Sequence, residues 1–367
     1  MALNCGIVGL PNVGKSTLFS ALTRTQVHTD IYPFTTVDPN TGVVAVPDVR
    51  LDTLSETLQP EKKIPTTLKI VDIAGLIKGS HHGEGLGNQF LAQIREADAI
   101  VHLIRCFESE NVTHISQTLD PVRDIEIIET ELILKDLETV TNRLEKVAKK
   151  VRVGDKAATK EQEVLERLQS NLDQGRTAKS LSLSKEDKEV FRDLFLLTDK
   201  PSLYVGNVNE EDITAHHSGT AAGELLAWGK ETSELVLILS AALEHELSFL
   251  QNEEERTFFM NEWQLQESGL EALVHQTYGL LNLITFFTTE SDHVQAWTAP
   301  NGTNAPEAAG VIHTDFEKGF IKADVYRCDD LFTHGSEAAV REHGLISTHG
   351  KDYTIQDGDV VKFRFKV

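Results

Sequence analysis

Cysteine is scarce in this sequence. The 367 residues contain three, Cys5, Cys106 and Cys328, which are widely separated. So few cysteines, odd in number, exclude a disulfide framework and predict a reducing compartment. Long apolar runs are also missing: none approaches the length of a membrane span, and the first expected strand begins too early for a signal peptide. We therefore expect a cytoplasmic protein that makes no membrane contact.

Positive charge is the second deficit. The chain has 35 Lys and Arg against 57 Asp and Glu, a formal net charge of −22. The field of so acidic a molecule repels nucleic-acid backbones, which excludes indiscriminate polyanion binding, so any RNA contact must use a local basic patch. The length predicts two or three domains, and 40% hydrophobic with 25% charged residues is typical of a globular protein.

A phosphate-binding loop is the strongest motif. Residues 9–17 read GLPNVGKST, between an apolar run at 5–8 that predicts a buried strand and a helical pattern at 18–22. Glycines in this context let backbone N–H groups close on phosphates at a helix N-terminus. Lys15 would reach the β- and γ-phosphates, and the Ser16 hydroxyl would ligate Mg²⁺. The intact GKS favours this interpretation over a glycine-rich turn without a ligand.

Two further segments fit a nucleotide switch. The loop at 31–37 could place a threonine hydroxyl on Mg²⁺ while the γ-phosphate is present, although it could equally be a surface loop with an aromatic anchor. An expected strand at 68–71 ends at a D-x-x-G signature, residues 72–75. Asp72 would lie near the metal, through a water, and the Gly75 N–H would meet the γ-phosphate.

The residue that orients the attacking water is not evident. Ras-like enzymes carry Gln after D-x-x-G, and this chain has Leu76, so hydrolysis must use another group or stay slow until a partner completes the site. His81, His82 and His114 could approach the γ-phosphate. Loop histidines are more often solvated, and that alternative stays open.

The base-recognition motif is altered. Expected strands at 99–105, 202–205 and 235–239 continue the sheet, and the second leads to Asn207-Val208-Asn209-Glu210, where guanine-specific proteins carry N-K-x-D. Adenine has neither the N1–H nor the 2-amino group that the missing Asp would accept. The departure therefore weakens the case for guanine and opens the case for adenine. Residues 240–242 could pack their backbone on the base.

An arm is inserted at about 124–196. Apolar residues recur at steps of mostly three or four from 125 to 151 and again from 164 to 172, which predicts an antiparallel helical hairpin that turns near Gly154. A capping pattern at 184–187 would open the returning helix. Near the tip, residues 146–160 contain six Lys or Arg and one Asp. We expect RNA contact there, with a solvated polar helix end as the alternative.

The C-terminal segment, 281–367, predicts a small mixed sheet crossed by a helix, in the β-grasp style. Strand-like runs lie at 283–288, 294–298, 321–325, 353–355 and 360–365, and short helical stretches near 306–312 and 337–342. The segment has no titratable cluster that suggests catalysis, so a binding module is expected.

Taken together, these motifs closely resemble the YchF family of Obg-like ATPases. The matching stretches are residues 6–17, 32–36, 72–76, 83–88 and 312–320. The resemblance implies an α/β P-loop NTPase domain, residues 1–280, with the arm as an inserted coiled coil, and a TGS domain, residues 281–367. It also implies preference for ATP over GTP and association with ribosomes.

The resemblance also implies roles for single residues. Ser16 and Thr36 would bind Mg²⁺, the Val208 backbone would contact adenine, and Asn207 fits the same motif. Asn12 could help hold a K⁺ near the phosphates. The phosphates would be held by Asn12, Val13, Gly14, Lys15, Ser16 and Thr17.

We therefore expect a Mg²⁺-dependent ATPase that acts as a ribosome-associated switch. Its candidate catalytic residues are Lys15, Gly75 and His114. Two alternatives stay open: an Obg-type GTPase, and a nucleotide-sensing scaffold with negligible turnover.

Overall fold

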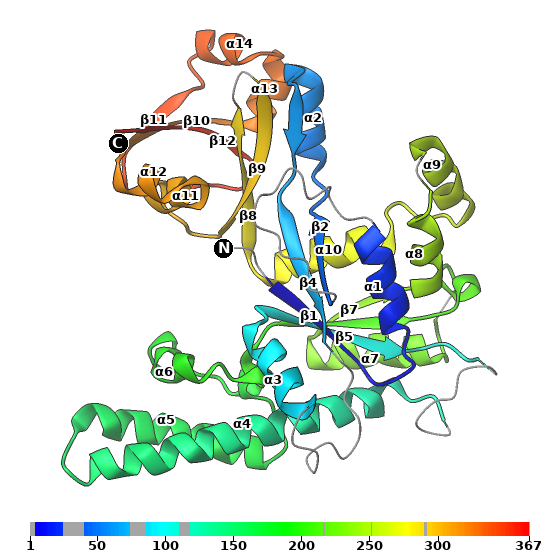
Figure 1. The fold of residues 1–367 in the computed structure, drawn as a ribbon, viewed down its shortest axis with the longest axis vertical. Coiled ribbons are helices and arrows are strands. Elements are labelled where there is room, and N and C mark those ends of the chain that lie inside the picture. Colours follow the sequence, from blue (N-terminus) through cyan, green and yellow to red (C-terminus); the bar gives the residue numbers. More distant parts are fainter. Residues whose placement is uncertain are drawn as a thin grey trace.

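The computed structural model describes residues 4–24, 40–73, 86–109, 118–215, 217–250, 252–289 and 292–366. A six-stranded sheet lies at its centre (Figure 1), with β2 antiparallel to β4 and the other neighbours parallel. The apolar runs of the sequence form these strands because parallel strands are buried on both faces. In spatial order they are β2 (Thr41–Ala45), β4 (Thr67–Asp72), β1 (Asn4–Val8), β5 (Ala99–Arg105), β6 (Ser202–Asn207) and β7 (Leu235–Leu239).

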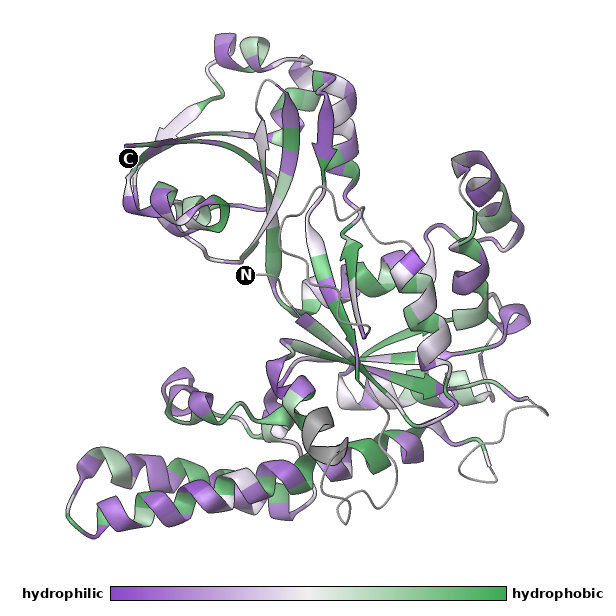
Figure 2. Cartoon of the chain, viewed as in Figure 1, coloured by the Kyte–Doolittle hydropathy of each residue, from purple (hydrophilic) through white to green (hydrophobic). Residues whose placement is uncertain are grey.

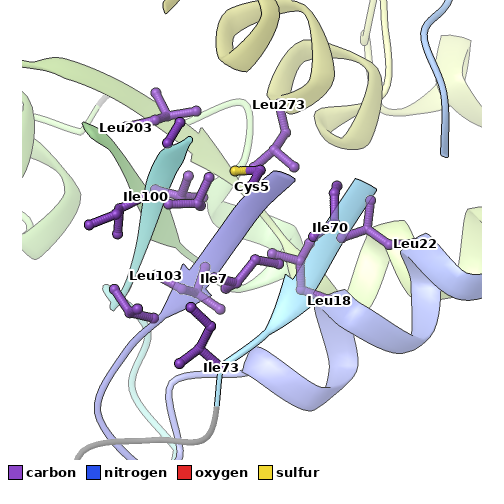
Figure 3. Packing of buried hydrophobic residues seen from close by; sticks show 14 of the residues in the cluster. Cys5, Ile7, Leu18, Leu22, Ile70, Ile73, Ile100, Leu103, Leu203 and Leu273 are labelled. Carbon is purple, nitrogen blue, oxygen red and sulfur yellow. The ribbon is translucent and has the colours of Figure 1, made fainter. Parts of the chain in front are cut away.

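Helices pack on this sheet and form one core with it. Leu18 and Leu22 of the first helix meet Ile7 and Ile70 of the strands, and all four side chains are buried (Figure 3). Burying one such side chain stabilises the fold by about 1.5–3 kcal/mol, so this core fixes where strand β1 ends and the first helix begins. The helices of this part are α1 (Lys15–Arg24), α3 (Leu86–Glu96), α7 (Ala221–Thr232), α8 (Ala241–Leu247), α9 (Glu253–Glu262) and α10 (Gly269–Leu280).

A helical hairpin projects from the central sheet, as predicted (Figure 1). It consists of α4 (Pro121–Val151) and α5 (Lys156–Asp173), which share a buried apolar seam. Gly154, at φ +86°, allows the turn, and the Asp155 side chain accepts N–H bonds from the first turn of α5. The charged surface around that seam gives the hairpin its mixed hydropathy, whereas the central strands are mostly hydrophobic (Figure 2).

The chain returns from the hairpin through short elements. Ser184 caps the first of them by accepting a hydrogen bond from Asp187 N at 3.1 Å, which confirms the predicted helix start. The buried carboxylate of Asp136 in α4 accepts the N–H groups of Leu197 and Thr198 at 2.8 Å and so fastens the hairpin to this segment. The elements are α6 (Lys185–Phe191) and the 3₁₀ turns η3 (Ala178–Ser180), η4 (Arg192–Leu194) and η5 (Leu197–Asp199), with η6 (Glu210–Asp212) after β6.

The C-terminal segment forms a second, mixed sheet with helices on it, as predicted. The expected strand at 353–355 is wrong. Thr354 makes a single bridge to Asn304, because the backbone on either side of it bonds to the loop before α11 instead of to a strand. In spatial order the strands are β11 (Ser347–His349), β10 (Phe320–Arg327), β12 (Asp359–Phe365), β8 (Leu283–Thr289), β9 (His293–Pro300) and β3 (Lys62–Ile64). The helices are α11 (Ala305–Ile312), α12 (Thr314–Lys318), α13 (Cys328–His334) and α14 (Glu337–Glu342).

One part of the second sheet comes from the first half of the chain. Strand β3 pairs in parallel with β9, and α2 (Val49–Leu58) places Leu51 and Leu54 in the core beneath this sheet. Arg50 of α2 also bonds to Asp357, at 2.6 Å. The excursion between β2 and β4 is thus packed with the C-terminal segment. Within the described ranges, no helix is both long and apolar enough to cross a membrane.

Candidate functional site

The loop between β1 and α1 has the backbone that a phosphate cradle requires. Asn12 and Gly14 have positive φ, +66° and +96°, which turns successive N–H groups toward one side. A Cβ on Gly9 would lie 2.6 Å from the carbonyl oxygen of Leu103, and one on Gly14 would collide with the side chain of Asn207. The glycines of the motif are therefore needed for close packing, and Gly14 also for its φ.

Lys15 lies against the end of β4. Its Nζ donates to the carbonyl of Ile73 at 2.6 Å and lies 3.6 Å from Asp72 Oδ1. Burial lowers the pKa of Lys15 and raises the pKa of Asp72, and in each case the partner's charge opposes the shift. Asp72 Oδ1 is buried and, among the described residues, has no hydrogen-bond partner. An acceptor oxygen is therefore available for a cation or water beside the loop.

The oxygen donors here suit a hard cation. Ser16 and Thr17 lie exposed in the first turn of α1, and Asp72 ends the neighbouring strand. Mg²⁺ is usually held by one or two protein oxygens, waters and the substrate's own phosphates, rather than by an all-protein cage. Consistent with this, the described ranges contain no cluster of three or more His, Cys, Asp or Glu that could hold a metal alone.

A cavity of about 390 Å³ opens next to the loop, at the carboxyl ends of β5, β6 and β7. Ligands of open α/β sheets bind at this edge. The size falls in the range of small-molecule sites. Its lining residues are Gly14, Thr17, Phe107, Asn207, Val208, Asn209, Glu210, Glu211, Ala241 and Ala242.

Asn207 connects the loop to this cavity. Its Nδ2 donates to the carbonyl of Val13 at 2.9 Å, and its Oδ1 accepts from Ala241 N at 2.8 Å. The side chain is buried, so both ends of the amide serve the fold. Asn207 therefore positions the first turn of α1 and the start of α8 relative to each other.

Val208 and Glu210 shape the wall next to Asn207. The Val208 N–H donates to Leu239 O at 2.9 Å, and its side chain is buried. Burial, followed by the charges of Glu246 and Glu211, raises the pKa of Glu210. Of the backbone polar groups of Val208, the carbonyl is the one that can serve a ligand.

Phe107 is a wall residue that sequence reasoning missed. It lies two residues beyond β5, where Arg105 holds it: Arg105 Nε donates to the Phe107 carbonyl at 3.0 Å, and the guanidinium lies 4.4 Å from the ring centroid. Its place just after a parallel strand was the available signal, since loops at that edge carry binding residues.

The structure thus brings together the predicted residues of the loop with Asp72, Asn207 and Val208. Three predicted site residues, Thr36, Gly75 and His114, lie outside the described residues. Leu76, His81 and His82 do as well. Their roles stay predictions, as does K⁺ binding near Asn12.

Two family models match the chain. One, MMR_HSR1, described as "50S ribosome-binding GTPase", matches residues 4–136, and the other, YchF-GTPase_C, described as "Protein of unknown function", matches residues 283–366. The first match covers the phosphate-binding loop, Lys15 and Asp72, and the second covers most of the C-terminal sheet.

Curated relatives and a solved structure match the whole chain. It is 48% identical over 367 residues to "Ribosome-binding ATPase YchF" of Escherichia coli O157:H7 and 44% identical over 367 residues to that of Bacillus subtilis, with 100% of both chains covered in each case. The structure titled "Structure of the Schizosaccharomyces pombe YchF GTPase" is 36% identical, with a TM-score of 0.88, covering 99% of this chain and 97% of that one. This chain therefore belongs to the YchF family.

Proposed function

We propose that this chain is a Mg²⁺-dependent ATPase that acts as a ribosome-associated nucleotide switch. The observation that carries the proposal is that Gly14 and Thr17 of the phosphate-binding loop line the same cavity as Asn207 and Val208. A nucleoside triphosphate can therefore place its phosphates on α1 and its base against β6. The names of the curated relatives, ribosome-binding ATPases, support the same activity.

At the phosphate end, residues 12–17 hold the triphosphate, and Lys15 leaves the Ile73 carbonyl for the β- and γ-phosphates. Ser16 and Thr36 bind Mg²⁺ directly and Asp72 through a water, which gives its buried Oδ1 a partner. The bound Mg²⁺ neutralises charge that develops on the phosphate oxygens.

Turnover is expected to be slow in the free protein. Leu76 cannot orient a water, and Gly75 and His114 are the proposed contacts at the γ-phosphate. A switch whose hydrolysis is completed by its partner fits this composition. The ribosome is the proposed partner, and the cytoplasm the proposed location.

At the base end, the proposed preference for ATP follows from hydrogen-bond polarity. With its N–H committed to Leu239, Val208 offers a carbonyl, which accepts from the 6-amino group of adenine and repels the O6 of guanine. The pocket also lacks the Asp that guanine-binding sites use, with Glu210 in its place.

Isothermal titration of the full chain with ATP and with GTP, each with Mg²⁺, tests the proposal. We expect ATP to bind at least tenfold more tightly, since a mismatched buried hydrogen bond costs about 1–3 kcal/mol. Lys15→Ala should abolish most of the affinity for both nucleotides. Tighter GTP binding would overturn the base assignment, and unchanged binding by Lys15→Ala would overturn the phosphate site.

A GTPase remains the second candidate because of one specific observation. The Glu210 carboxyl lines the cavity and could accept from guanine N1–H, and both the matching family model and the Schizosaccharomyces pombe structure carry the word GTPase. The same titration decides between the two. A chain that binds ATP but releases no phosphate, alone or with ribosomes, would instead be the scaffold.

The hairpin, as a coiled-coil arm, and the C-terminal segment, as a TGS domain, are the proposed ribosome contacts. At the hairpin tip Lys149, Lys150, Arg152 and Lys156 are exposed. Clustered exposed cations on an acidic protein give RNA binding that weakens steeply with salt. Lys149→Glu with Lys150→Glu should lower affinity for naked ribosomal RNA and reduce its salt dependence, and unchanged binding would exclude the tip as the RNA contact.

A further inference from the structure

Helix α9 carries aromatic residues that the rest of the described chain does not cover. Phe258 is 66% exposed, and Phe259, Met260 and Trp263 remain partly exposed. The neighbouring helix α10 is of similar length and buries Leu270, Leu273 and Val274, whereas none of the described side chains of α9 is buried. A ten-residue helix has marginal stability in water without packing, so its aromatic residues suit a partner's surface.

The exposed aromatic surface extends to the turn before the helix. Phe249, between α8 and α9, is 51% exposed, and the guanidinium of Arg24 lies 3.9 Å from its ring centroid. Exposed Phe and Trp side chains are the residues that most often anchor protein interfaces. The edge position of α9 in Figure 1 leaves room for such a contact.

Charge decides which kind of partner fits. Residues 246–267 contain six Glu and one basic residue, Arg256, whose guanidinium is paired with Glu271 at 2.9 Å. Glu254, Phe258 and Glu262 are four residues apart and so share one face of the helix. An aromatic side chain between two carboxylates repels a phosphate backbone and complements a lysine- or arginine-rich peptide with an apolar side chain.

We propose that the exposed face of α9, with Phe258 at its centre, docks a lysine- and arginine-rich segment of a ribosomal protein. This inference rests on the proposed ribosome association. The hairpin tip, which is basic, and α9, which is acidic, lie on opposite sides of the central sheet in Figure 1. One surface thus takes RNA and the other takes protein.

Binding of the full-length protein to purified ribosomes tests this surface. Phe258→Ser removes the anchor and Glu254→Lys with Glu255→Lys reverses the charge. Ile321→Ser, at a residue 56% exposed on β10, is the matched control. We expect the α9 variants to bind ribosomes at least about tenfold more weakly and to bind naked ribosomal RNA as the wild type does, with the control unchanged. The two kinds of α9 variant alter the surface in unrelated ways, so a folding defect in one leaves the other as the test.

A photo-crosslinking residue in place of Phe258 identifies the occupant. The proposal predicts a crosslink from purified ribosomes into a Lys- and Arg-rich segment of a ribosomal protein. Crosslinks into ribosomal RNA alone, or into a second copy of this chain, would overturn it. So would equal ribosome affinity of wild type and both α9 variants, with the proposed function intact. Failure of the wild type to bind ribosomes would overturn the proposed function itself.

Discussion

Asn207 donates a hydrogen bond from its Nδ2 to the carbonyl of Val13, across 194 residues of sequence, at 2.9 Å. The same amide accepts from Ala241 N at 2.8 Å. One buried side chain thus ties the loop that would hold phosphates to the turn that would face the base. The distance between the two ends of the site is set by this amide.

Replacing Asn207 with Ala should therefore damage both stability and binding. The change leaves the buried Val13 carbonyl and Ala241 N–H unpaired, at about 1–3 kcal/mol each. We expect the free energy of unfolding in urea to fall by about 2–5 kcal/mol and ATP affinity to fall with it. Asn209→Ala is the control, since Asn209 is exposed on the same loop. Equal stability of the two variants would show that the amide is not a structural brace.

Gly14 can be tested against Gly154, because both have positive φ, +96° and +86°. Alanine at either position strains the backbone by about 1–2 kcal/mol. At Gly14 the new Cβ also collides with Asn207, whereas nothing lies within 4 Å at Gly154. We expect Gly14→Ala to lose ATP binding in titration and Gly154→Ala to keep wild-type affinity with a small loss of stability. Wild-type affinity in Gly14→Ala would contradict the close packing seen here.

The sequence could predict the elements whose signal is local. The buried strands of the central sheet are continuous apolar runs, and the stripe from 125 to 151 has a helical period, so both are readable without a fold. Glycine and lysine spacing likewise located the phosphate-binding loop.

What escaped prediction depends on distant partners. Strand β3 has three residues, and it exists because Lys62 to Ile64 pair with His293 to Gln295, more than two hundred residues away. Asn207 was expected at the base, and only the fold shows that its amide is used twice inside the protein. Phe107 belongs to no motif, and its role follows from the edge of the sheet where it lies.

Base preference should respond to two substitutions in the cavity wall. Val208→Lys with Glu210→Asp restores the N-K-x-D pattern, in which Asp accepts from guanine N1–H and its 2-amino group. We expect the ratio of ATP to GTP affinity to shift toward GTP by about tenfold or more, measured by titration of both nucleotides. Glu211→Asp makes the same chemical change at another residue of the cavity and should leave the ratio unchanged. A shift of equal size in both variants would exclude a specific role for Glu210.

His102 offers a prediction on acid stability. Its ring is 2% exposed, stacks on Tyr204 at 4.7 Å, and has an Nδ1 without a hydrogen-bond partner among the described residues. Burial, reinforced by the charge of Lys179, lowers its pKa from 6.5 to about 3. Between those two pH values the unfolded chain binds a proton that the folded chain excludes. The contribution of this group to stability is therefore complete above pH 6.5 and is lost as the pH falls toward 3.

His102→Phe keeps a ring on Tyr204 and removes this titration. Relative to the variant, the wild type should lose about 2 kcal/mol of unfolding free energy between pH 7.5 and pH 5, given the lowered pKa. Urea unfolding of both proteins at the two pH values measures the difference, in which the other titrating groups cancel. His349→Phe is the control, because His349 also stacks on a tyrosine, Tyr353, at 4.0 Å but is partly exposed. If wild type and His102→Phe lose the same free energy on acidification, the ring of His102 takes up its proton inside the folded protein.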